Sequence, residues 1–157
     1  MRNVLLVLAA TLLFAPHATN AAPPKGTGRA PASAPVTKEK AKLVFVAMTG
    51  LEDLMTLSSS LRHATVAAKS PQYSEVVWMS YGRSIVVLDP TVKAVPSSIH
   101  ELAREAKKAG VRLVACEQAL TKFDIDPKRL AFPAETVPNA IDELGRLIAE
   151  GFAVIRY

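Results

Sequence analysis

Cys116 is the only cysteine in the chain, and its position suits a nucleophile. It follows the apolar run 111–115, and the residues from Glu117 to Leu120 can continue from it as a helix. This pattern predicts a strand that delivers the thiol to the carboxyl edge of a sheet, where open parallel α/β sheets bind ligands. A helix N-terminus at that point would favour the reactive thiolate. The alternative is a buried structural side chain, because free cysteine is among the most buried residue types.

Charged neighbours bear on this choice. A carboxylate at Glu117 would disfavour the thiolate if it pointed at the sulfur, and the cations Lys122 and Arg112 would offset that effect. A lone cysteine in an exported protein has no partner for an intramolecular disulfide. The thiol is therefore either sheltered in the core or free to react outside its own chain, and both interpretations stay open.

Other catalytic and cofactor-binding motifs are missing. Gly50 stands alone after the first apolar run, so the glycine-rich loops that bind dinucleotides and triphosphates are absent from the sequence. A single cysteine excludes Cys-x-x-Cys redox pairs and cysteine-rich zinc sites. His63 and His100 fall within predicted helices, where surface positions are the usual outcome. No Ser/His/Asp set is visible in the sequence. Because such triads assemble in space from distant residues, a hydrolase is kept as a third possibility beside the two hypotheses given below.

The first residues predict export. Arg2 precedes an apolar stretch from Val4 to Ala15, and small residues follow up to Ala21, as in a cleaved signal peptide over residues 1–21. The apolar stretch is short for a membrane span, which needs about 20 residues, and an uncleaved anchor is the alternative. We therefore expect an exported protein, located in a bacterial periplasm, with no integral membrane span after cleavage.

Residues 22–41 are rich in Pro and Ala, a composition typical of a flexible linker. Residues 42–157 are long enough for one domain with a single core. That domain holds 14 Lys and Arg against 13 Asp and Glu, so most of the basic excess lies in the leader and linker. No basic stripe with interleaved aromatic residues is present in the domain, which argues against a nucleic-acid partner.

Apolar runs and helical patterns alternate along the domain. Strands are predicted at 42–48, 75–80, 111–115, 135–137 and 152–157, and the short apolar run 85–88 is compatible with a further strand. Capping-box spacing at Thr49–Glu52 and Ser98–Glu101 predicts two helix starts. Gly110 and Gly151 suit helix ends. The alternation predicts an α/β fold, a three-layer α/β/α sandwich with a mostly parallel, flavodoxin-like sheet of about five strands.

A pocket is predicted beside Cys116. Thr49 and Gly50 follow the first strand, and Ser80 and Tyr81 lie at the end of the second. The carboxyl ends of parallel strands share one edge of a sheet, so these residues are expected to line one ligand site.

A recognisable pattern covers most of residues 42–157 and rests on 111–116, Ala119-Leu120, the Ile125 segment, 137–140, Leu144 and 151–155. In these segments the chain resembles the DsrE/DsrF-like sulfur-relay family. It implies a parallel sheet flanked by helices, a homo-oligomer that is a trimer or a multiple of one, and a persulfide carried on Cys116. It implies no metal and no organic cofactor. The export signal and linker depart from the well-studied members, which are cytoplasmic.

Two hypotheses from different classes follow. The first is a periplasmic sulfur carrier or sulfurtransferase that accepts sulfane sulfur on Cys116 and passes it to a partner protein. The second is a non-catalytic, oligomeric binding module that retains the fold and binds a small ligand or a protein at the pocket near Thr49 and Tyr81.

Overall fold

The computed structural model describes residues 39–131 and 134–157. The predicted signal peptide, residues 1–21, and most of the predicted linker lie outside the described residues. The first strand begins at Ala41, one residue before the predicted start of the domain. Within the described ranges, no helix is long and apolar enough to cross a membrane.

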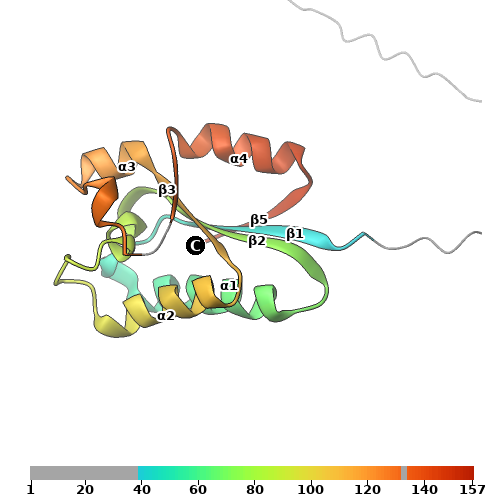
Figure 1. Cartoon of the computed structure of the whole chain (residues 1–157), viewed down its shortest axis with the longest axis horizontal. Helices are drawn as coiled ribbons and strands as arrows, with labels where there is room; N and C mark the ends of the chain where they lie inside the picture. Colours follow the sequence, from blue (N-terminus) through green and yellow to red (C-terminus); the bar gives the residue numbers. More distant parts are fainter. Residues whose placement is uncertain (1–38, 132–133) are drawn as a thin grey trace, which may run out of the picture. The chain divides into compact units, whose positions relative to one another are not determined.

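Five parallel strands form a single sheet in the order β4-β3-β2-β1-β5, which confirms the predicted fold class (Figure 1). Each predicted strand other than the run 85–88 is found within a residue or two of its expected place. The strands are β1 (Ala41–Ala47), β2 (Tyr73–Ser80), β3 (Arg112–Cys116), β4 (Glu135–Val137) and β5 (Phe152–Arg156).

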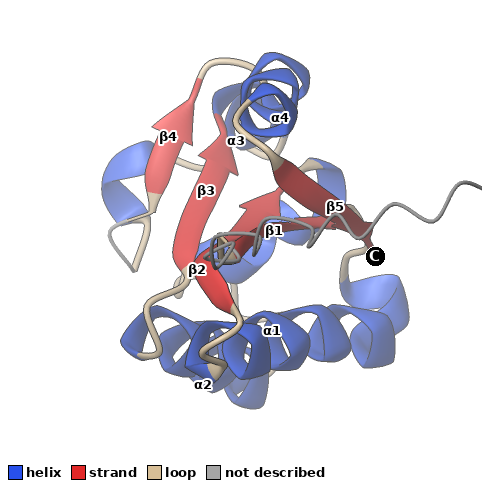
Figure 2. Cartoon of the chain, turned by 90° about the vertical axis from the view of Figure 1, so that its right-hand side faces the viewer, coloured by secondary structure: helices blue, strands red, loops and turns tan. Residues whose placement is uncertain are grey.

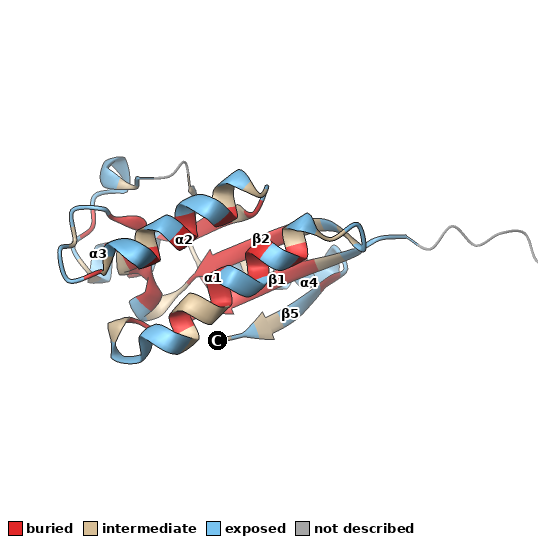
Figure 3. Ribbon diagram, turned by 90° about the horizontal axis from the view of Figure 1, so that it is seen from below, coloured by how far each residue is buried: buried red, intermediate tan, exposed pale blue. Residues whose placement is uncertain are grey.

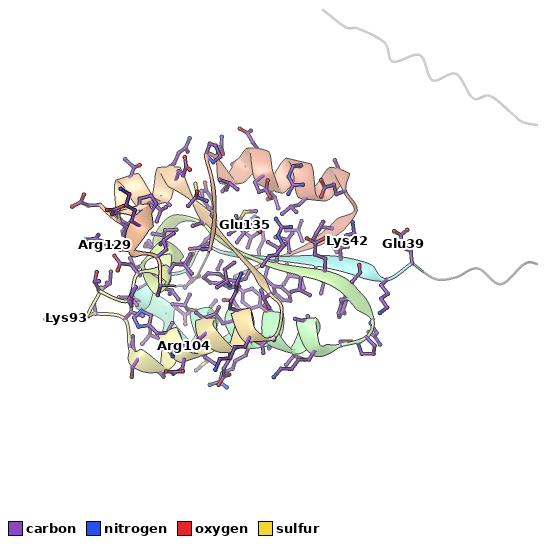
Figure 4. All side chains as sticks on the ribbon, in the orientation of Figure 1. Glu39, Lys42, Lys93, Arg104, Arg129 and Glu135 are labelled. Atoms are coloured by element: carbon purple, nitrogen blue, oxygen red, sulfur yellow. The ribbon has the colours of Figure 1, made fainter. Side chains whose placement is uncertain are left out.

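Helices cover both faces of the sheet. On one face lie α1 (Leu54–Lys69) and α2 (Ser97–Lys108), and on the other lie α3 (Glu117–Lys122) and α4 (Ala140–Ala149) (Figures 1 and 2). Figure 4 shows Lys42 near the amino ends of the strands and Arg129 near the opposite end. Short 3-10 helices complete the chain at η1 (Leu51–Asp53), η2 (Gly82–Leu88) and η3 (Pro127–Arg129).

The core lies on both sides of β1, β2 and β3. These strands are buried over most of their length because helices cover both of their faces. Figure 3 shows the buried sides of α1 and α2 turned toward the sheet. Trp78 is the largest fully buried side chain, and its indole Nε1 donates a hydrogen bond to the Ser60 hydroxyl of α1 at 2.9 Å. This bond satisfies the one polar atom of the indole inside the core.

Both predicted capping boxes are wrong. The helix α1 is capped by Asp53, whose carboxylate accepts from the Thr56 backbone N–H at 3.0 Å, and Thr49 lies in the loop before it. The helix α2 begins at Ser97 after Pro96, without a side-chain cap. A capping box needs a particular backbone conformation as well as the spacing. Gly110 and Gly151, in contrast, follow α2 and α4 with φ angles of +95° and +87°, as predicted for helix ends.

The run Ile85–Leu88 belongs to the 3-10 helix η2 and is not a strand. Ile85, Val87 and Leu88 are fully buried, so the run is apolar because it packs in the core. A short apolar run does not by itself distinguish a buried strand from a buried helical turn.

Trp78→Phe is expected to lower the free energy of unfolding by about 1–3 kcal/mol. The substitution leaves a void beside α1 and removes the donor to Ser60. Urea unfolding followed by circular dichroism measures the change, and Tyr73→Phe at the half-buried start of β2 is the control. A change below about 0.5 kcal/mol would show that the indole contact contributes little.

Candidate functional site

Cys116 is the last residue of β3 and the residue immediately before α3. Its thiol therefore lies at the carboxyl edge of the sheet, as predicted. The side chain is buried, with 1% of its surface exposed. The helix that follows it has only six residues, so few peptide dipoles add up to the positive partial charge at its N-terminus.

A cleft of about 540 Å³ lies at this edge, and Cys116 is part of its wall. Its lining comes from the ends of β1 and β2, from the start of η2 and from α3. The lining residues are Met48, Thr49, Tyr81, Gly82, Arg83, Cys116, Gln118, Ala119 and Lys122. Two of these side chains are cationic and none is a carboxylate, so the cleft suits an anionic ligand.

The turn after β2 is held by Ser84. Its hydroxyl donates to the Ala47 carbonyl at 2.5 Å and accepts from the Tyr81 backbone N–H at 3.2 Å. The Tyr81 N–H also reaches the Ala47 carbonyl at 2.9 Å, which extends the pairing of β1 and β2 by one residue. Gly82 then takes a φ of +70°, a left-handed conformation that glycine adopts without strain. This turn places Tyr81 and Arg83 in the cleft wall.

Gly50 has a structural role. A Cβ at this position would lie 2.7 Å from the Arg83 Cβ, so only glycine permits this approach of the two loops. The Glu52 carboxylate accepts from the Gly50 backbone N–H at 3.0 Å and pairs with Arg83 Nε at 2.8 Å. The Gly50 N–H, and to a smaller extent Arg83, hold the pKa of the Glu52 carboxyl below its usual value.

The predicted pocket is therefore present in part. Thr49 and Tyr81 line the cleft together with Cys116. Ser80 is fully buried and hydrogen-bonds to the Ser84 hydroxyl at 3.0 Å, and Gly50 packs against Arg83, so neither is among the lining residues. The sequence did not predict five of the lining residues, which are Met48, Gly82, Arg83, Gln118 and Ala119. Their signal was position, since each directly follows or lies near the end of a strand.

Of the two cations considered as neighbours of Cys116, only Lys122 lies near it. Lys122 lines the cleft, but Arg112 lies at the opposite end of β3. Arg112 is bound there by Glu75 and Glu135, with N–O distances of 2.5 and 2.8 Å. These hydrogen bonds raise its pKa further above the usual range, so Arg112 is not available to the thiol. Glu117 is exposed and is absent from the cleft lining.

The sequence matches the DsrE/DsrF-like family profile over residues 41–157. The chain belongs to the DsrE/DsrF-like family. This confirms the resemblance noted in the sequence. No protein with a curated description matches this sequence significantly.

Solved structures share the fold of this DsrE/DsrF-like domain. MTH1491 of Methanobacterium thermoautotrophicum, a protein of unknown function, superposes with a TM-score of 0.60 at 21% identity, over 75% of this chain and 100% of its own. The ychN protein of E. coli gives a TM-score of 0.61 at 14% identity, over 74% of this chain and 99% of its own. BT1422 of Bacteroides thetaiotaomicron, also of unknown function, gives 0.60 at 12% identity, over 74% and 94%. At these identities the similarity establishes the fold alone.

The two histidines of the domain lie away from the cleft lining. His63 is exposed on α1, as predicted, and shares a hydrogen bond with the Tyr157 hydroxyl. His100 is half-buried, and its Nε2 atom has no hydrogen-bond partner among the described residues. Burial, followed by the charge of Arg104, lowers the pKa of His100, and the buried Asp89 opposes this effect. Arg129 Nη2 lies 3.4 Å from the Asp89 carboxylate and links η3 to this cluster.

The His100 cluster predicts a loss of stability in mild acid. Because its folded pKa lies below the unfolded value of about 6.5, the unfolded chain binds more protons near and below that pH. The contribution of His100 is complete above about pH 6.5 and is lost as the pH falls toward the folded pKa. The free energy of unfolding is expected to fall between about pH 7 and 5.5, by less than about 1.4 kcal/mol per pH unit, the limit for one proton.

Urea unfolding at several pH values measures this slope, and most carboxyl groups titrate below the window. His100→Gln should flatten the curve between pH 5.5 and 7. An equally steep curve in the variant would assign the slope to other groups.

Proposed function

We propose that this protein carries sulfane sulfur on Cys116 as a persulfide and passes it to a partner protein. The observation that supports this function is the place of Cys116 in the wall of a cleft of about 540 Å³ at the carboxyl edge of the sheet. Membership of the DsrE/DsrF-like family supports a sulfur-relay role for this cysteine. The cleft has room for an additional sulfur atom and for part of a donor.

The proposed transfer is an exchange between sulfur atoms. The Cys116 thiolate attacks the outer sulfur of a persulfide or polysulfide, a new S–S bond forms, and the old S–S bond breaks with its electron pair leaving on the donor sulfur. Passing the sulfur on repeats the exchange with a partner's cysteine as the nucleophile. Arg83 and Lys122 support this step, because polysulfide and persulfide donors are anionic and two cations line the cleft.

The burial of Cys116 favours a second candidate. With only 1% of its surface exposed, the residue resembles a structural thiol. In this case the cleft binds a small ligand or a protein segment without thiol chemistry, and Thr49 and Tyr81 contribute to binding. Such a binding module would retain its ligand when Cys116 is replaced by serine.

The proposed function includes a location and an assembly. The leader sequence supports export to a bacterial periplasm, where a sulfur carrier would need partners other than cytoplasmic relay proteins. A homo-oligomer, as a trimer or a multiple of one, is supported by membership of the DsrE/DsrF-like family. Met55 and Val66 of α1 are 81% and 67% exposed, and these apolar side chains are candidates for a contact between subunits.

Brief treatment of folded protein with polysulfide is expected to add sulfur to Cys116. Intact mass should show a gain of one sulfur atom that is reversed by a reducing thiol, because a persulfide is reducible. Cys116→Ser should abolish the gain, since no other cysteine is present in the chain. If the folded protein neither takes up sulfur nor reacts with iodoacetamide, and both reactions occur only after denaturation, the result would contradict the carrier function and favour the binding module.

A further inference from the structure

A second cavity, of about 290 Å³, adjoins the Cys116 cleft. Met48 and Tyr81 belong to the walls of both, so the two spaces share a boundary. The residues that line the second cavity are apolar apart from Arg156 and the amphipathic Tyr81. Its lining residues are Val46, Met48, Met79, Tyr81, Ala140, Ile141, Leu144 and Arg156. An apolar cavity with few polar groups is typical of small-molecule sites.

The strand register places both spaces on one face of the sheet. Val46 is level with Met79 on β2 and with Arg156 on β5, and Met79 is level with Val114 on β3. Side chains two residues apart in a strand share a face, so Cys116 lies on the same face as Val114. This is the face covered by α4, which contributes Ile141 and Leu144 to the cavity.

The two spaces lie next to each other along the carboxyl edge from β3 to β5, and together they are called the groove. It begins at Cys116, passes Tyr81 and Met48 at the ends of β2 and β1, and ends at Arg156. Three strand spacings separate β3 from β5, which is roughly 14 Å. An extended molecule of the size of a tripeptide fits this length.

Arg156 has the chemistry to bind the far end of such a molecule. Its Nη2 donates to the Met48 thioether at 3.4 Å, and thioether sulfur is a weak acceptor. Arg83, Arg112 and Arg146 each pair with a carboxylate, whereas Arg156 forms no ion pair within residues 39–131 and 134–157. No carboxylate lines either space. A guanidinium in this position suits a ligand carboxylate, which it binds through two parallel hydrogen bonds.

We propose that the sulfur donor of Cys116 is a small organic persulfide that carries a carboxylate, held in this groove with its carboxylate on Arg156. This assignment rests on the proposed function and names the donor for it. The Cys116 thiolate, its proton lost to water, attacks the outer sulfur of the donor R–S–SH. The bond between the two donor sulfurs breaks, Cys116–S–SH forms, and R–S⁻ leaves with the electron pair and takes up a proton. Sulfur changes carrier without a net oxidation or reduction.

Loading by two donors tests the assignment. Glutathione persulfide has carboxylates and an extended body, and the persulfide of 2-mercaptoethanol has neither. Intact mass of the folded chain, followed over time, gives the donor concentration for half-maximal loading of Cys116. Arg156→Gln is expected to raise this concentration about tenfold for glutathione persulfide and to leave it unchanged for the smaller donor, because only the first donor forms the charge-assisted bonds. Arg156→Lys should recover part of the loss.

Arg62→Gln is the matched control, since Arg62 is exposed on α1 and lines neither space. An Arg156→Gln variant that loads normally from glutathione persulfide would overturn the donor assignment and leave the carrier function standing. If Arg156→Gln weakens loading equally with both donors, the effect is structural, and the donor assignment is overturned in the same way. A failure of the carrier function itself is distinguished by a binding experiment. Calorimetry measures the binding of unreactive S-methylglutathione to the Cys116→Ser variant, with and without Arg156→Gln. Arg156-dependent binding without any loading of the native chain would overturn the persulfide donor and the carrier function together.

Discussion

The parallel pairing of β2 with β1 and β3 is the constraint on which the site depends. It brings the ends of three strands to one edge and places Cys116, Tyr81 and Met48 in neighbouring positions. Side chains alternate between the faces of a sheet, so a shift of one residue in β3 would move Cys116 to the face covered by α1 and α2. The buried rows of all three strands resist such a shift, because it would expose core side chains.

The loops at this edge are shaped by close contacts within the protein. Ser84 ties the start of η2 to the last carbonyl of β1, and Gly50 allows the loop after β1 to approach Arg83. These contacts use Gly50, Ser80 and Ser84 for structure and leave Thr49, Tyr81 and Arg83 facing the cleft. The lining of the cleft is thus a consequence of how the two loops pack against each other.

Charge is distributed unevenly along the sheet. At the amino end of β3, Arg112 is paired with Glu75 and Glu135, and the hydrogen bond from Arg112 holds the pKa of Glu135 below its usual value. At the carboxyl edge the cleft and the adjoining cavity are lined by Arg83, Lys122 and Arg156 without a carboxylate. The first arrangement joins strands β2, β3 and β4. In the second, Arg83 pairs with Glu52 outside the lining, whereas Lys122 and Arg156 form no ion pair among the described residues. The charge at the two ends of the sheet differs because carboxylates bind the cation at the amino end of β3, whereas no carboxylate lines the two spaces at the carboxyl edge.

The amino-acid sequence by itself determined the strands and most of the helices, the fold class, the family and the position of Cys116 at the end of β3. Continuous apolar runs and helical patterns that end in glycine involve neighbouring residues only, so they can be recognised in the sequence without the structure. Only the tertiary structure decided that Ile85–Leu88 is a helical turn, that Asp53 caps α1, and that Gly50 and Ser80 are structural. It also brought Arg156 to the same edge as Cys116. The close approach of Gly50 to Arg83 and the place of Arg156 beside Met48 depend on contacts between distant segments. The Asp53 cap and the Ser80–Ser84 bond are local, but they depend on a backbone conformation that the spacing of the residues does not specify.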